Sequence, residues 1–139
     1  MRGWLLAAAC LLLLGLAARP APAAGPDKAG PWLAPEKARE LNRLEPRPWF
    51  WFFEARWCYL CKEMKARSLS DPEVIRLLTK KFWAVKVDVE KRPDLKAVFK
   101  VYFLPTTVIL TSKGQPMVRK RNFIHTEDLL KILRGAAGD

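Results

Sequence analysis

Hydrophobic and polar positions change period several times along the chain, and each change predicts a secondary-structure element. Residues 35–44 carry apolar side chains at helical spacing after an opening proline, which predicts a helix. Residues 49–53 form an unbroken aromatic run, WFWFF, which predicts a central strand covered on both faces. Residues 58–66 have helical composition. The first half of the chain therefore predicts helix, strand and helix in that order.

The second half continues the alternation. Ser70 to Glu73 has the spacing of a capping box, and Pro72 suits the first turn, so a helix is expected from there to about residue 80. The other expected elements are a strand at 82–89, a short helix at 93–101 that buries a stripe of Leu95, Val98 and Phe99, a hairpin of strands at 106–110 and 116–120, and a last helix at 126–133.

This order of elements predicts an α/β fold. Strands separated by helices favour parallel pairing, and the closing hairpin adds an antiparallel edge. We therefore expect a mixed central sheet flanked by helices.

The N-terminal pattern differs from the rest and predicts a signal peptide over residues 1–23. Arg2 precedes a long apolar block, and Ala21 to Ala23 has the A-x-A form of a cleavage site. Arg19 and Pro20 interrupt the block before the roughly 20 apolar residues that a membrane span needs, so cleavage is favoured over an uncleaved anchor. Lipidation of Cys10 is disfavoured because the apolar run continues beyond it.

Cleavage would leave a flexible lead at residues 24–34 and one domain at residues 35–135. The domain is expected to be exported. The C-terminal sequence AAGD is not an endoplasmic-reticulum retention signal, so a bacterial periplasm is the favoured location.

The chain has more basic than acidic residues, with a formal net charge of +11. A basic surface favours acidic partners, anionic membranes or nucleic acid. The basic residues are scattered and no nucleic-acid-binding motif accompanies them, so nucleic acid is not an expected partner. The charge predicts solubility and a weak preference for acidic clients.

The cysteines carry the candidate chemistry. Cys58 and Cys61 are the cysteines that remain after the predicted cleavage, and a pair three positions apart adds little stability by closing a loop. The pair lies where a strand gives way to a helix, and the positive end of a helix stabilises a thiolate. We therefore expect Cys58 to be an exposed nucleophile with a lowered pKa, and Cys61 to be a sheltered resolving thiol.

Other uses of a C-x-x-C pair fit less well. A zinc site lacks ligands, because His125 is the one histidine and no second C-x-x-C occurs. Haem attachment needs a histidine where Lys62 stands. A Cu(I) site of two thiolates stays open. No metal or other cofactor is expected for the redox function, and no G-x-G-x-x-G nucleotide signature is present.

Three motifs belong together: WCYLCK at residues 57–62, SDPEV at 70–74 and FLPTT at 103–107. They resemble the thioredoxin superfamily, most closely the C-terminal thioredoxin-like domain of periplasmic thiol:disulfide interchange proteins, and the similarity covers residues 35–133. The resemblance implies a thioredoxin fold and disulfide exchange with protein clients, with the protein acting as a reductant. It also implies a membrane or soluble thiol reductase as electron donor, and we expect a monomer.

The resemblance also implies client-binding residues around the pair. Leu104 and Pro105 match a segment that pairs with client backbone, in which the proline is cis and faces the cysteines. Tyr59 and Leu60 stand between the cysteines, where this superfamily tunes its redox poise, and they are expected to contact clients. Trp57 is expected either in the core or at the client surface.

Two positions depart from the family pattern. Phe52 stands where the family has a buried aspartate, although Lys86 matches the lysine often paired with it. Glu54 lies two residues on, hence on the same strand face, and we hypothesise that it partly replaces the missing acid. The alternative is a solvated loop residue. Asn122 replaces a family glycine and tolerates a positive φ.

Two other functions stay open for the same fold. One is a client-binding or chaperone module without redox turnover, and the other is a Cu(I) carrier that uses the cysteine pair.

Overall fold

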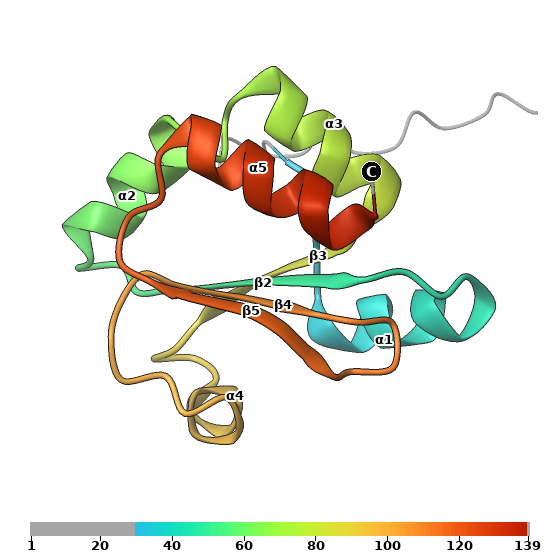
Figure 1. Cartoon of the computed structure of the whole chain (residues 1–139). Coiled ribbons are helices and arrows are strands. Elements are labelled where there is room, and N and C mark those ends of the chain that lie inside the picture. Colours follow the sequence, from blue (N-terminus) through green and yellow to red (C-terminus); the bar gives the residue numbers. More distant parts are fainter. Residues whose placement is uncertain (1–29, 139) are drawn as a thin grey trace, which may run out of the picture.

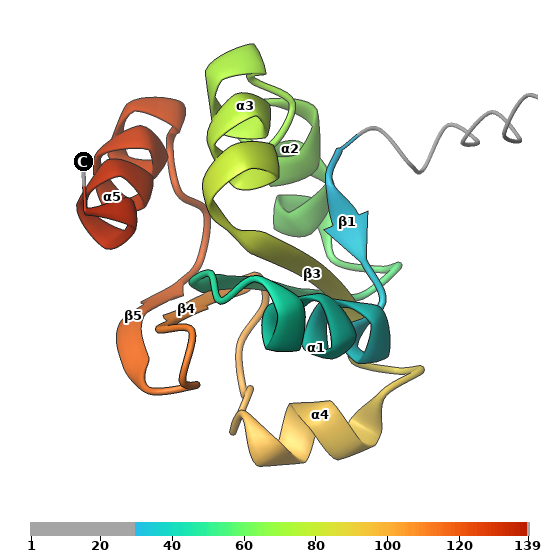
Figure 2. The same cartoon turned by 90° about the vertical axis from the view of Figure 1, so that its right-hand side faces the viewer.

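The computed structural model describes residues 30–138, in which helices cover both faces of a five-stranded sheet (Figures 1 and 2). The strand order is β1-β3-β2-β4-β5. The elements in chain order are β1 (Trp32–Leu33), α1 (Pro35–Leu44), β2 (Trp49–Glu54), α2 (Tyr59–Ala66), α3 (Pro72–Lys81), β3 (Trp83–Asp88), α4 (Pro93–Val98), β4 (Thr106–Leu110), β5 (Pro116–Arg121) and α5 (Thr126–Ala137).

The predicted signal peptide and most of the predicted lead lie outside the described residues. The end of that lead was wrongly expected to be flexible, because Trp32 and Leu33 form β1 and pair in parallel with Ala84 and Val85 of β3. Within residues 30–138, no helix combines the length and the hydrophobicity that a membrane crossing requires.

Strand β2 is central, as its aromatic run predicts, and all six of its residues are buried. Trp51 and Phe53 contact Phe99, which follows α4, whereas Phe50 and Phe52 contact Trp32 of β1. Successive side chains of a strand point to opposite faces, so the aromatic run fills the core on both sides of the sheet. Each fully buried aromatic side chain stabilises the fold by about 1.5–3 kcal/mol. The burial of its aromatic side chains therefore favours the central position of β2 in the sheet.

The pairing of β4 differs from the prediction. Strands β1, β3 and β2 are parallel, but β4 is antiparallel to β2, with Phe53 opposite Thr106 and Trp49 opposite Leu110. A helix between β3 and β4 does not enforce parallel pairing here, because the α4 segment returns to the edge of the sheet at which β3 ends. In Figure 1, α4 lies below the sheet and the chain rises from it to the start of β4.

Two predictions about individual helices, the N-cap of α3 and the buried stripe of α4, are wrong. The N-cap of α3 is Asp71, not Ser70, and its carboxylate accepts hydrogen bonds from the backbone N–H groups of Glu73 and Val74. Pro72 occupies the first helical position, so the cap falls on the residue directly before it. Helix α4 has no buried residue, and Val98 of its predicted stripe is 74% exposed.

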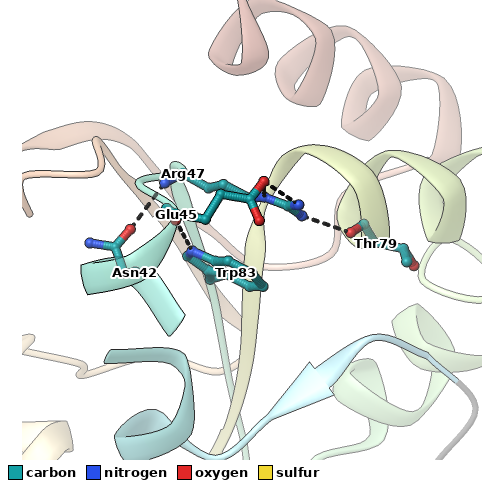
Figure 3. A network of polar contacts seen from close by, with 5 residues as sticks. All are labelled: Asn42, Glu45, Arg47, Thr79 and Trp83. Carbon is teal, nitrogen blue, oxygen red and sulfur yellow. Dashed lines mark hydrogen bonds and ion pairs between the residues drawn. The ribbon is translucent and has the colours of Figure 1, made fainter. Parts of the chain in front are cut away.

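A polar network ties the sheet to its helices at the end remote from the cysteines (Figure 3). The Arg47 guanidinium bonds the Glu45 carboxylate and the backbone carbonyl of Thr79 near the end of α3. It also lies 4.4 Å from the ring centroid of Trp83, whose indole N–H donates to the carbonyl of Glu45. Asn42 accepts the backbone N–H of Arg47. The network anchors the starts of β2 and β3, which leaves the opposite edge for the site.

Candidate active site

The two cysteines lie at the start of α2 and form a disulfide. Cys58 is the N-cap of the helix, with an extended backbone, and its Cα lies 5.3 Å from that of Cys61. The Cys58 sulfur accepts a hydrogen bond from the backbone N–H of Cys61 over 3.2 Å. That N–H is one of the donors that a helix leaves unpaired in its first turn. The first cysteine therefore sits where the helix dipole favours negative charge on sulfur.

The exposure of the pair differs in part from expectation. Cys61 is fully buried, as predicted for a resolving thiol, but Cys58 is only 5% exposed. As the N-cap, Cys58 turns its side chain back over the first turn of α2, where its sulfur is bonded to that of Cys61. In the oxidised protein, only a small part of Cys58 is therefore accessible to an attacking thiol.

The side chains around the pair are large and exposed. Trp57 and Tyr59 are 67% and 69% exposed, and Leu60 is also exposed, so the core position considered for Trp57 is wrong. The Trp57 indole N–H donates to the Glu90 carboxylate over 3.2 Å, which holds the ring beside the loop that follows β3. An apolar surface therefore surrounds the start of α2.

Strand register brings the segment Leu104–Pro105 to the same edge of the sheet. Strand β2 ends there, and antiparallel β4 begins there with Thr106 opposite Phe53. The Leu104–Pro105 bond is cis, Leu104 is half-buried and Pro105 is buried. The Pro105 carbonyl accepts the backbone N–H of Asn122 over 2.8 Å.

Asn122 follows β5 and has a φ of 79°, the conformation that its side chain tolerates. Its own carboxamide oxygen accepts the backbone N–H of Phe123 over 2.9 Å. The departure from glycine at this position is thus accommodated by the backbone.

The sequence prediction missed Tyr102 and Phe103, although Phe103 belongs to the motif that carried the resemblance. Both rings are exposed directly before Leu104, and the Arg121 guanidinium lies 5.4 Å from the Phe103 ring centroid. The signal available in the sequence was two adjacent aromatic residues directly before Leu104–Pro105. Large apolar side chains on a surface commonly mark contacts with a partner.

Glu54 is the last residue of β2 and is only 8% exposed, so the solvated-loop alternative is wrong. It lies on the same face of the strand as Phe52, the face that α2 covers. Its carboxylate is 2.5 Å from the ammonium of Lys65 on α2 and 3.9 Å from that of Lys86 on β3. Lys65 was not predicted, and it lies one helical turn after Cys61. These ion pairs link the sheet to α2, the helix that carries the two cysteines.

No group of three or more histidine, cysteine, aspartate and glutamate side chains lies close enough to hold a metal within residues 30–138.

A mixed sheet of this topology, with a C-x-x-C pair at a helix start and a cis proline at the same edge, defines a thioredoxin-fold protein of the thiol–disulfide oxidoreductase class. The particular family follows from comparison with known proteins. The family model described as "Thioredox_DsbH: Protein of unknown function, DUF255" matches residues 30–129, and the chain belongs to this family. The predicted membership of the thioredoxin superfamily is thereby confirmed.

Individual relatives agree with this assignment. Over 110 residues the chain is 31% identical to human spermatogenesis-associated protein 20, covering 73% of this chain but only 14% of the human protein. A thioredoxin from Thermus thermophilus superposes with a TM-score of 0.69 at 28% identity, covering 80% of this chain and 94% of the thioredoxin. The C-terminal domain of Neisseria meningitidis DsbD in its oxidised form gives 0.62 at 21% identity, with 73% and 90% covered, which shows a shared fold.

Proposed function

We propose that this protein is an exported thiol–disulfide oxidoreductase that reduces disulfides in protein clients. The observation that carries the proposal is the position of Cys58, whose sulfur caps α2 and accepts the N–H of Cys61 while it is bonded to the Cys61 sulfur. A sulfur so placed leaves readily as a thiolate and is poised to attack.

The reaction is an exchange of bonds between sulfurs. In the reduced protein the Cys58 thiolate attacks a client disulfide, and the client's second sulfur leaves as a thiolate that takes up a proton. The Cys61 sulfur then loses its proton and attacks Cys58, which closes the observed disulfide and releases the first client sulfur. The client gains two electrons and two protons, and a separate thiol reductase must return two electrons to the pair.

The surface around the pair suits a protein client. Trp57, Tyr59 and Leu60 adjoin the cysteines in the chain and are exposed, and strand register brings Leu104 and Pro105 to the same edge of the sheet. Exposed Tyr102 and Phe103 extend this surface. We assign these seven residues to client binding, because large apolar side chains contribute most of the contact energy in such interfaces.

Glu54 and Lys86 are assigned a supporting role. The Glu54 carboxylate is buried against Lys65, and Lys65 shares a face of α2 with Cys61. A buried negative charge whose lysine partner lies one helical turn after Cys61 influences which protonation state Cys61 favours. Lys86 holds the same carboxylate from the sheet. Glu54 would thus act as a positioning residue in place of the aspartate that Phe52 replaces.

Export, the donor and the oligomeric state complete the proposal. A cleaved signal over residues 1–23 would deliver the domain to a periplasm or another exported location, where a membrane or soluble thiol reductase would supply electrons. We propose a monomer whose clients are proteins rather than nucleic acid.

The test is reduction of insulin disulfides with dithiothreitol as donor, comparing the wild type with Cys58→Ser and Cys61→Ser. We expect the wild type to accelerate insulin precipitation and both variants to fall to the rate of dithiothreitol alone. Cys61→Ser should also accumulate a mixed disulfide through Cys58, whereas Cys58→Ser should not. A wild type no faster than dithiothreitol, with client binding equal in all three proteins, would indicate a binding module instead.

A further inference from the structure

A cavity lined by charged side chains opens beside the redox pair, and the mechanism above uses only part of it. Its volume is about 270 Å³. Four cations meet two carboxylates around it, and we call it the cationic cavity. Its lining residues are Glu54, Arg56, Lys65, Lys86, Asp88 and Lys91.

The cavity opens at the side of the sheet because β1 is short. Strand β1 pairs with β3 only as far as Val85, so among the described residues the second half of β3 has no neighbouring strand on that side. Lys86 and Asp88 lie in this uncovered half. Among residues 30–138, no strand therefore separates the cavity from solvent on this side of the sheet.

The charges in the cavity are not balanced internally. Glu54 is paired with Lys65 and Lys86, and Asp88 accepts the backbone N–H of Glu90. Arg56 and Lys91 are both exposed, and neither side chain has an ion-pair or hydrogen-bond partner within residues 30–138. The nearby Glu90 carboxylate is engaged by the Trp57 indole. The surplus positive charge thus lies at the mouth of the cavity.

The mouth is within reach of a client bound at Cys58. Arg56 precedes Cys58 by two residues, so their Cα atoms are at most about 7 Å apart. An extended client chain advances by about 3.4 Å per residue. A client side chain two or three positions from the cysteine bonded to Cys58 therefore reaches Arg56, which lines the cavity together with Lys91.

We infer that the cationic cavity binds an acidic side chain of the client, two or three residues from its reacting cysteine, and so selects clients with acidic flanks. This specificity rests on the proposed exchange function. The carboxylate would lie between the guanidinium of Arg56 and the ammonium of Lys91, since charge-assisted hydrogen bonds from such donors favour a carboxylate. Opposite charge also speeds the encounter that precedes the attack by Cys58.

The experiment uses the reduced protein and short peptides whose single cysteine is bonded to a chromogenic aromatic thiol. Attack by Cys58 forms the bond to the peptide sulfur and releases the coloured thiolate, which stopped-flow absorbance follows. One peptide carries Asp two residues from the cysteine, a second carries Asn there, and a third carries Asp seven residues away. The readout is the rate of thiolate release from each Asp peptide divided by the rate from the Asn peptide.

We expect a ratio of about two to five at low ionic strength, falling towards one in 0.5 M salt, about the effect of one exposed ion pair. The distant Asp should give a ratio near one. The double variant Arg56→Gln/Lys91→Gln should abolish the preference, whereas the matched variant Lys80→Gln/Lys96→Gln, which removes the same charge from exposed lysines elsewhere, should keep it.

The outcomes separate the two proposals. Release of no coloured thiolate from any peptide would contradict the exchange function itself. Release at equal rates from the Asp and Asn peptides would overturn the cavity's role and leave the exchange function standing. An equal loss of preference in both double variants would assign the effect to overall surface charge and would also overturn the inference.

Discussion

The carboxylate of Glu54 lies 2.5 Å from the ammonium of Lys65, so the end of the central strand is bonded to the helix that carries both cysteines. Lys65 is one turn from Cys61, and Lys86 approaches the same carboxylate from β3. The charge is nearly enclosed, because Glu54 is buried at the edge of the sheet. The redox pair and the sheet are thus coupled through one ion-pair network.

Replacing Glu54 with Gln should weaken both the fold and the exchange reaction. The change leaves two lysines without their carboxylate, which we expect to lower the free energy of unfolding by about 1–2 kcal/mol, less than for a fully buried pair because Lys65 is partly exposed. The pH profile of thiol exchange should also shift. Urea unfolding and exchange rates across pH measure the two effects.

A suitable control for that variant is Glu63→Gln on α2, which removes a carboxylate from a more exposed pair with Arg67. It should leave the pH profile unchanged. An unchanged profile in Glu54→Gln as well would show that Glu54 is purely structural.

Reduced Cys58 should react with iodoacetamide much faster than Cys61 and at lower pH than free cysteine. The reason is the N-cap position, where unpaired helix N–H groups favour the thiolate and so lower the pKa of Cys58. Alkylation rates of Cys61→Ser, measured against pH by mass spectrometry, give the pKa directly. A Cys58 thiol that titrates like free cysteine would remove the basis of the proposed function.

The exposed aromatic residues should matter for protein clients and not for small ones. We expect Trp57→Ala and Tyr102→Ala each to slow insulin reduction several-fold, because large apolar side chains dominate interface energies. Leu44→Ala provides the control, since Leu44 is exposed at the end of α1. Equal slowing with oxidised dithiothreitol as substrate would point instead to a changed cysteine pair.

The N-cap of α3 can be tested by two neighbouring substitutions. Asp71→Ala removes the acceptor of two backbone N–H groups and should destabilise the protein by about 1 kcal/mol. Ser70→Ala removes a hydroxyl that donates to the Lys65 carbonyl and should have the smaller effect. Urea unfolding of both variants decides between the observed cap and the capping box that the sequence suggested, which requires the opposite order.

Acid should weaken the contact between α3 and α5. A side-chain hydrogen bond from Arg76, assisted by Arg134 of α5, lowers the pKa of Glu73 from 4.5 to about 2. A carboxylate whose pKa is lower in the folded state stabilises the fold above its unfolded pKa, and that contribution is lost as the pH falls through the folded value. Glu73→Gln should therefore be less stable than wild type above pH 4.5, and the difference should vanish near pH 2 in thermal melts.

Much of the site was predictable because its signals are local. The C-x-x-C pair at a strand-to-helix junction required only the residues around it, although the helix begins at Tyr59 with Cys58 as its N-cap, one residue later than expected. The burial of Cys58 was not predictable, because it depends on how the side chain turns back over α2. The partners of Trp57 and Glu54 were also missed, since Glu90 and Lys65 belong to elements whose relative placement no local pattern encodes.

The sequence by itself determined the order and type of the main elements, the central position of the aromatic strand and the chemistry of the cysteine pair. These follow from side-chain periodicity and from groups close together in the chain. Only the tertiary structure decided that β4 runs antiparallel to β2, that Glu54 pairs with Lys65, and that six charged residues line one cavity. Such placements depend on which surfaces pack against each other, and this packing involves elements that are far apart in the chain.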